Sequence, residues 1–322
     1  MMPLTPRTNR DPAVDALGVP ASDPYAAFMG ELVREGLLIP SGVPGVVGRG
    51  GLFEDVLQRL DQLITRMGSG EQATVMRFPS IIPRAHFERS GYLKSFPQLI
   101  GSISSFTGGE HDHRNLLRML DRGDDWSKPL TATDVVLTPA ACYPVYPVFS
   151  GQVVPKGGIL VDVLTTCFRH EPSNDPARMQ MFRQREYVLI GDPAAVRAHR
   201  DLWLARGMQM LDEVKLRARE EIANDPFFGR AGRMLAGNQR DQALKFELLV
   251  PICSEEAPTA CVSCNYHEDH FGHAFDITLE DGSAAHTACV GFGLERISLA
   301  LFKQHGFDIG KWSAGVRQAL GF

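Results

Sequence analysis

Hydrophobic residues recur every three or four positions over residues 52–67, and this spacing predicts an amphipathic helix that ends at Gly68. A run rich in β-formers over 73–78, closed by Pro79, predicts a strand directly after it. A shorter helical pattern covers 25–37. The chain therefore begins its ordered part with a helix, and a strand follows.

Further along the chain, helical and extended patterns alternate irregularly. We expect β-rich runs over 134–149, 158–170, 181–191, 244–252 and 273–279, a long charged helix over 196–222, and a helix from Leu294. There is no internal repeat, no regular βαβ rhythm and no glycine-rich phosphate loop of the common nucleotide folds. This mixture favours an α+β fold with a mainly antiparallel sheet.

The composition is that of an ordinary globular protein, with 322 residues, 44% of them hydrophobic and 22% charged. No apolar run is long enough for a membrane span and no secretory signal is visible, so we expect a cytoplasmic protein without a membrane partner. A net charge of −5 disfavours a polyanionic partner such as tRNA. Residues 1–50 are rich in Pro, Gly and Ala and predict a loosely structured leader, with the main domain over 51–322.

The six cysteines suggest metal binding or burial rather than disulfides. Cys261 and Cys264 lie close to a run of histidines at 267, 270 and 273, a spacing that would permit a zinc site. That site would be cramped, and on a strand the two cysteines would face opposite ways. We therefore favour pocket lining for this segment, and core positions for Cys167 and Cys253.

The segment 164–191 predicts a hairpin that carries chemistry. Strand alternation places Arg169 and Glu171 on one face of the first strand, and Phe182 and Glu186 on one face of the second. A guanidinium, two carboxylates and an aromatic ring would suit a nucleotide. Judged from these residues alone, an exposed hairpin with surface ion pairs, each worth at most ~1 kcal/mol, is the better interpretation.

A resemblance to known sequence motifs favours the nucleotide-binding interpretation of this hairpin. The sequence F-R-x-E at 168–171, followed by a loop and a strand with Phe182, resembles motif 2 of class II aminoacyl-tRNA synthetases. GFGLERISLALF at 291–302 resembles motif 3, and the helix at 52–67 with its strand and prolines resembles motif 1, in family order. The resemblance implies a class II α+β fold with helices flanking the sheet, a helical insertion near 195–235, and a homodimer through motif 1.

The resemblance also implies roles for the motif residues. Arg169 would be the catalytic residue that binds the α-phosphate of ATP and the substrate carboxylate. Glu171 would accept from the adenine amine, Phe182 would stack on the adenine, and Arg296 would cover its other side. Mg²⁺ would accompany ATP. Gly291 and Gly293 would let the backbone pass close to the nucleotide.

A metal site is implied as well. LTPAACYPV at 137–145 resembles the substrate loop of seryl-tRNA synthetases, with Cys142 where those enzymes usually carry Glu. In atypical seryl enzymes of methanogens a Cys, a Glu and a Cys hold zinc, and the matching residues are Cys142, Glu186 and Cys289. One Zn²⁺ per subunit would keep a coordination position for the substrate amine. Ser263 and Asn265 resemble the substrate-binding run of the seryl enzymes.

No basic tRNA-binding arm is visible, and the chain closely resembles bacterial amino acid:[carrier protein] ligases. These join glycine or alanine to the phosphopantetheine thiol of an acidic carrier protein. Basic residues on or near the long helix would dock that partner: Arg197, Arg200, Arg206, Lys215, Arg217 and Arg219. The alternatives are a truncated seryl-type enzyme that charges tRNA, a biotin or lipoate ligase, and a non-enzymatic relative.

Overall fold

A computed structural model describes residues 23–322, and its centre is a seven-stranded sheet. The strand order is β3 (Thr74–Arg77), β7 (Ile159–Phe168), β8 (Met181–Gly191), β12 (His286–Gly293), β11 (Thr259–Tyr266), β10 (Lys245–Val250) and β9 (Arg219–Ile222). β3 pairs in parallel with β7, and the other neighbours are antiparallel. The sheet is therefore mainly antiparallel, as expected, and it is mixed only because the edge strand β3 runs parallel to its neighbour.

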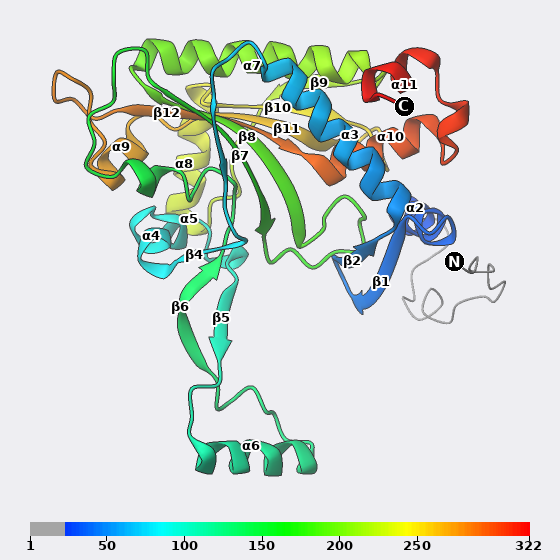
Figure 1. Cartoon of the computed structure of the whole chain (residues 1–322), viewed down its shortest axis with the longest axis vertical. Coiled ribbons are helices and arrows are strands. Elements are labelled where there is room, and N and C mark those ends of the chain that lie inside the picture. Colours follow the sequence, from blue (N-terminus) through cyan, green and yellow to red (C-terminus); the bar gives the residue numbers. More distant parts are fainter. Residues whose placement is uncertain (1–22) are drawn as a thin grey trace.

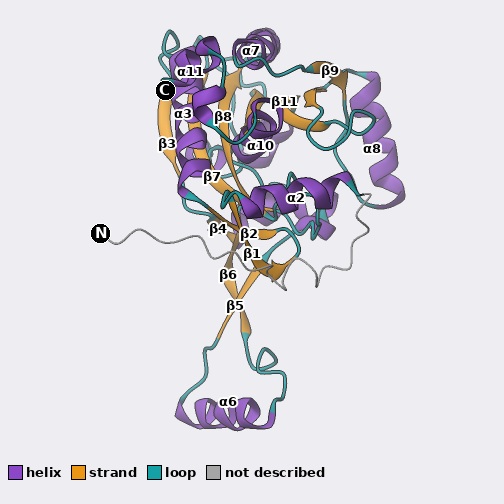
Figure 2. Ribbon diagram, turned by 90° about the vertical axis from the view of Figure 1, so that its right-hand side faces the viewer, coloured by secondary structure: helices purple, strands orange, loops and turns teal. Residues whose placement is uncertain are grey.

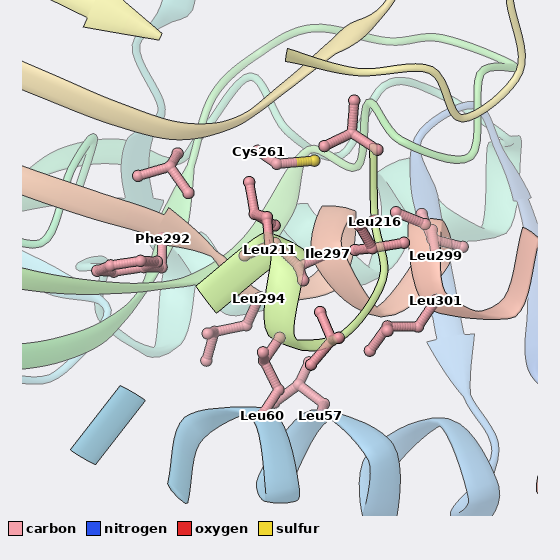
Figure 3. Packing of buried hydrophobic residues seen from close by; sticks show 14 of the residues in the cluster. Leu57, Leu60, Leu211, Leu216, Cys261, Phe292, Leu294, Ile297, Leu299 and Leu301 are labelled. Carbon is pink, nitrogen blue, oxygen red and sulfur yellow. The ribbon is translucent and has the colours of Figure 1, made fainter. Parts of the chain in front are cut away.

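Three helices cover one face of this sheet: α3 (Gly51–Gly68), α7 (Pro193–Glu213) and α10 (Leu294–His305). Their apolar side chains join those of the strands in the largest core cluster. In Figure 3, Leu57 and Leu60 of α3 lie near Ile297 and Leu301 of α10, with Phe292 of β12 beside them. The helical spacing read from 52–67 thus corresponds to a face that is buried in the core.

The other face of the sheet carries a smaller core and the candidate site. The loop after β6, the helical turn η2 (Tyr146–Phe149) and the short helix α9 (His270–Phe275) pack there. Tyr146 stacks on Phe271 with ring centroids 3.9 Å apart, which ties that loop to α9. The loop that contains Cys142 is held against the strands by these aromatic contacts.

The N-terminal part of the described chain is ordered, and the expectation of a loose leader is wrong for residues 24–49. They form α2 (Pro24–Arg34), β1 (Leu38–Val43) and β2 (Val46–Arg49), and Phe28 and Leu32 are buried in the main core. The turn between β1 and β2 also binds Gln180, whose side chain donates to Pro44 O at 2.8 Å. Residues 1–22, which belonged to the same expectation, lie outside the described residues.

An arm projects from the body in both views (Figures 1 and 2). It consists of a three-stranded sheet, in the order β4 (Ile81–Pro83), β6 (Thr131–Leu137) and β5 (Ser102–Ser105), and of α6 (Glu110–Arg122) at its far end. No side chain of α6 is buried, and Leu117 and Leu120 are exposed. Within residues 23–322, no helix has the length and apolar character that a membrane crossing needs.

The remaining elements are α4 (Arg84–Arg89), α5 (Tyr92–Ser95), η1 (Pro97–Leu99), α8 (Gly229–Asp241), η3 (Ile309–Lys311) and α11 (Ala314–Leu320). Two predicted elements need correction. The helix expected over 196–222 ends at Glu213, because Lys215 has a left-handed backbone conformation, and residues 219–222 form β9. The strand expected over 273–279 begins as α9, since a short apolar run fits either element.

Candidate functional site

A pocket of about 1000 Å³, including its open mouth, lies over the middle of the sheet on the face opposite α7. Most of the residues that the sequence singled out line it: Cys142, Arg169, Phe182, Glu186, Ser263, Asn265, Cys289, Gly291, Gly293 and Arg296. The structure therefore brings together residues from motif 2, motif 3 and the substrate loop. Gln184 lines it as well, as strand alternation between Phe182 and Glu186 requires.

The sheet register arranges these side chains in rows. Ser263 on β11 lies opposite Gly291 on β12, which in turn lies opposite Glu186 on β8. Two residues further along, Asn265 lies opposite Cys289. Because residues directly opposite each other share a face, a floor of polar side chains forms across the three central strands.

Cys142, Glu186 and Cys289 form a compact cluster in this floor. One ligand atom from each lies within 4.8 Å of the other two, and all three residues are buried. Ala141 N donates to Glu186 Oε1 at 3.1 Å, but Glu186 Oε2 has no hydrogen-bond partner among the described residues. A buried carboxylate oxygen without a partner, beside two sulfur atoms, fits a divalent cation such as Zn²⁺.

The surroundings raise the pKa of all three groups of this cluster. Burial raises the pKa of the Cys142 thiol to about 11. The pKa of Cys289 is raised mainly by its contact with the Cys142 thiol and also by burial. Burial raises the pKa of Glu186 as well. Asn265 Nδ2 and His267 Nε2 both lie 3.6 Å from Cys289 Sγ, at hydrogen-bonding distance from a thiolate. A cation would displace protons from these groups, and the two nitrogens support the resulting charge.

Arg169, Phe182 and Arg296 surround the other part of the pocket. The Arg169 guanidinium carbon lies 5.4 Å from the centre of the Phe182 ring. Arg296 Nε donates to Ala177 O and its Nη1 to Ala260 O, each at 2.9 Å. Arg296 thus spans from the motif 2 loop to β11, and burial lowers its pKa. Two arginines beside an aromatic ring suit a nucleotide phosphate and a base.

Glu171 differs from its expected placement. β7 ends at Phe168, so strand alternation does not extend to Glu171, and Glu171 N instead donates to Arg169 O at 2.8 Å in a turn. The Glu171 carboxylate lies 3.4 Å from Arg178 Nη1. Glu171 is not among the described residues that line the pocket. Contact with adenine stays a prediction for Glu171.

The two motif 3 glycines are not equivalent. A Cβ on Gly291 would lie 2.7 Å from Gln184 Nε2 and 3.3 Å from Glu186 Cγ, so a side chain there would crowd the floor. A Cβ on Gly293 would meet its nearest neighbour, Arg296, at an ordinary 3.6 Å. The close-approach argument therefore applies to Gly291, and Gly293 marks the turn into α10.

The cysteine–histidine run at 261–273 does not converge on one point. Cys264 is buried in the main core, on the other face of the sheet from the pocket. His270 contacts Ser90 O at 2.9 Å, while His273 lies at the surface beside Asp269. The candidate metal cluster within residues 23–322 includes no residue of this run. Pocket lining, as expected, describes the segment better than a second zinc site.

Sequence reasoning missed a buried ion cluster in the pocket wall. Lys245 Nζ lies 2.5 Å from Asp225 Oδ1 and 3.0 Å from Glu247 Oε1, and all three residues line the pocket. Lys245 and Glu247 lie directly opposite Asn265 and Ser263, so they extend the same rows. The alternation of K-F-E within the apolar strand 245–250 was the available signal.

The basic residues predicted to dock a carrier protein lie away from the pocket. α7 covers the opposite sheet face, and Arg200 is buried there with its Nη1 bonded to Ala243 O at 2.8 Å. Arg206 pairs with Glu71 at 2.5 Å, and Arg217 with Glu255 at 2.7 Å. These positions do not support docking on α7.

Known proteins resemble the chain over almost its whole length. No family model matches. The chain is 46% identical to amino acid--[acyl-carrier-protein] ligase 2 of Bradyrhizobium diazoefficiens, over 94% of this chain and 89% of that protein. Ligase 1 of the same organism is 44% identical, over 94% and 93%. Among solved structures, the M. kandleri seryl-tRNA synthetase bound to A. aeolicus tRNASec aligns with a TM-score of 0.79 at 22% identity, over 94% of this chain and 62% of that one.

Proposed function

Because the chain belongs to the amino acid--[acyl-carrier-protein] ligases, we propose that it activates a small amino acid with ATP and passes the aminoacyl group to a carrier-protein thiol. The observation that carries the proposal is the meeting of Cys142, Glu186 and Cys289 in one pocket with Arg169 and Arg296. One part of the pocket suits an amino acid and the other a nucleotide.

The reaction would proceed in two steps. In the first, a carboxylate oxygen of the amino acid attacks the α-phosphorus of ATP, and pyrophosphate leaves. In the second, the phosphopantetheine thiol attacks the carbonyl carbon of the adenylate, a thioester forms, and AMP leaves. Arg169 would stabilise the charge that develops at the α-phosphate, and the rigid sheet would hold both reactants in place.

ATP would bind between motifs 2 and 3. Phe182 would stack on the adenine and Arg296 would cover its other side, while Glu171 would accept from the adenine amine after a shift of its turn. Mg²⁺ would enter with ATP. The contact of the Arg169 guanidinium with the Phe182 ring supports this arrangement, because a planar base could replace the guanidinium on the ring.

The amino acid would bind at the metal cluster. Cys142, Glu186 and Cys289 would hold one Zn²⁺, which leaves a coordination position for the substrate amine. Ser263 and Asn265 would contact the bound amino acid from β11. Metal ligands crowded around the amino acid would favour a small side chain, glycine or alanine, and one methyl group changes affinity by only ~1–3 kcal/mol.

Amino-acid-dependent exchange of labelled pyrophosphate into ATP tests the first step. We expect exchange with glycine or alanine, followed by thioester formation on a phosphopantetheinylated carrier protein. The seryl-type alternative predicts instead that serine supports exchange and that tRNA accepts the product. Absence of exchange with every amino acid would refute the enzyme proposal. We also propose a homodimer through α3, which sedimentation velocity would test.

We place the carrier-protein docking surface on α8 rather than α7. Asp225 and Pro226, directly before α8, line the pocket, so this helix lies near its mouth. Its sequence GRAGRMLAGNQRD holds three arginines and a single acid, at the last position. A basic helix beside the pocket complements an acidic partner.

A charge reversal tests this placement. We expect Arg233→Glu to raise the KM for the carrier protein roughly tenfold without changing pyrophosphate exchange, because Arg233 is exposed on α8. Arg197→Glu on α7 is the matched control and should leave the KM for the carrier protein unchanged. The reverse pattern would return the docking surface to α7.

A further inference from the structure

Four charged side chains meet beneath the proposed adenine site, where β2, α3, β8 and α10 come together. Arg183 donates through both Nη atoms to Glu54, at 2.6 and 2.8 Å, and through Nε to Glu295 Oε1 at 2.9 Å. Arg49 Nε donates to Glu54 Oε1 at 2.7 Å, and Arg49 Nη1 lies 3.7 Å from Glu295 Oε1. We call these residues (Arg49, Glu54, Arg183 and Glu295) the four-charge cluster.

The four-charge cluster is balanced and largely enclosed. Glu295 is 2% exposed and Arg183 19%, so water screens this part of the cluster weakly. The guanidinium of Arg183 binds Glu54 as a fork and reaches Glu295 with its remaining Nε–H, a geometry that a lysine cannot reproduce. The hydrogen bond from Arg183 holds the pKa of Glu54 below its usual value, which keeps this carboxylate paired with the arginines.

Arg183 and Glu295, the two most buried members of the cluster, are each next in sequence to a residue that we assign to adenine binding. Arg183 follows Phe182 on β8, and the two side chains point to opposite faces of the strand. Glu295 precedes Arg296 in the first turn of α10. Arg183 N also donates to Glu295 Oε2 at 2.8 Å, which joins the backbone of β8 to that helix turn. The bonds between residues 183 and 295 therefore fix Phe182 relative to Arg296.

We propose that the four-charge cluster positions Phe182 and Arg296 for nucleotide binding, with Arg183 and Glu295 as positioning residues and Glu54 as the anchor on α3. The inference rests on the proposed ATP-dependent function. None of the four side chains lines the pocket, so they act through their neighbours rather than by touching ATP. The cluster also brings α3 and β2, two elements outside motifs 2 and 3, into the support of the nucleotide site.

The test compares ATP binding in conservative variants of the cluster. We expect Glu54→Gln and Arg183→Lys to weaken ATP binding in calorimetric titration, and to raise the KM for ATP in pyrophosphate exchange, by roughly tenfold. The KM for the amino acid and the bound metal should change less than about twofold, because the metal cluster keeps its own contacts. If Arg183→Lys does not fold, Arg49→Lys at the rim of the cluster permits the same comparison.

Glu71→Gln is the matched control. Glu71 also pairs a partly buried carboxylate with an arginine of another element, Arg206 of α7, but neither residue is a chain neighbour of Phe182 or Arg296. It should lower the free energy of unfolding without changing ATP binding. The inference would be overturned if the cluster variants bound ATP as tightly as the parent protein. It would also be overturned if Glu71→Gln weakened ATP binding as much as the cluster variants do. Either result would leave the proposed function standing. A parent protein that does not bind ATP would overturn the proposed function and, with it, this inference.

Discussion

Cys142 and Cys289 show how much the chemistry of a residue depends on its surroundings. Both thiols are nearly inaccessible to water, and each is close to the other and to the Glu186 carboxylate. Cys264, on β11, is just as buried but packs among apolar side chains of the main core. Cysteines of similar burial therefore differ in what they can bind, because Cys142 and Cys289 have further ligand atoms beside them and Cys264 does not.

Serine substitutions test this difference. We expect Cys142→Ser and Cys289→Ser to retain little Zn²⁺ after dialysis, because a hydroxyl replaces one of the two sulfur ligands. Cys264→Ala is the control and should retain about one Zn²⁺ per chain, the same as the parent. Atomic emission on the purified proteins would measure the metal. If only the Cys264→Ala protein lost its metal, the zinc site would lie instead in the cysteine–histidine segment 261–273.

The raised thiol pKa values predict a steep pH dependence of metal uptake. Because the pKa of Cys142 is about 11 and that of Cys289 is raised as well, both thiols are protonated between pH 6 and 8 in the metal-free protein. Binding as thiolates releases two protons, so the apparent affinity should rise roughly a hundredfold per pH unit. Competition with a chromophoric chelator at several pH values would measure it. A flat profile would mean that the sulfurs are not both ligands.

For single residues, the sequence located members of the pocket where strand periodicity or a motif pointed to them. Strand alternation placed Phe182 and Glu186 on one face, and the family resemblance singled out Cys142 and Cys289 as partners of Glu186. Sequence reasoning did not find Asp225, which follows β9 in a loop, lines the pocket and pairs with Lys245. Loop residues carry no period, so their position depends on packing that the sequence alone does not display.

The positions of helices and strands in this protein depend on the close approach of their backbones as well as on the burial of apolar side chains. The end of α3 packs against β8 so tightly that a Cβ on Gly68 would lie 2.1 Å from Tyr187 Oη. Tyr187 itself stacks on Trp203 of α7, with ring centroids 3.9 Å apart. Gly68 thus permits α3, β8 and α7 to approach one another.

Gly68→Ala should therefore lower the free energy of unfolding by about 1–3 kcal/mol, because the added methyl group must displace Tyr187. Gly70→Ala, two residues further along, has no neighbour within 4 Å of the added Cβ and should stay within about 0.5 kcal/mol of the parent. Urea unfolding would compare the two. Equal stability of the two variants would show that the helix shifts freely.

Element prediction followed the strength of the local pattern. The pattern over 52–67 predicted α3 to within a residue or two, because six of its positions are buried at helical spacing. β9 was read as the end of α7, since its residues Arg219–Ile222 are all exposed and give no period-two signal. An edge strand that buries nothing has no hydrophobic pattern to reveal it.

The whole molecule separates into a body that contains the pocket and the distal part of the arm, residues 106–130, which contributes no buried side chain. Ser105 and Thr131 are register partners at the end of β5 and β6, and no residue between them is buried. The arm also carries the exposed apolar residues Leu117, Leu120 and Trp126. Its removal should therefore leave the body intact.

Replacement of residues 106–130 by an Asn-Gly turn tests that separation. We expect the free energy of unfolding to change by less than about 1 kcal/mol, because only exposed side chains and a long loop are lost. Pyrophosphate exchange should persist. A deletion protein that is unfolded or inactive would show that the arm supports the body, for instance through a second subunit.

The order of strands in the central sheet has a consequence for biosynthesis. Among the strands of residues 23–322, β12 comes last along the sequence, yet it lies between β8 and β11. Until it leaves the ribosome, those two strands have open edges that can pair with other chains. A nascent chain of this protein therefore exposes two unpaired strand edges until β12 has been made, and Cys289 can meet Cys142 and Glu186 only after that point.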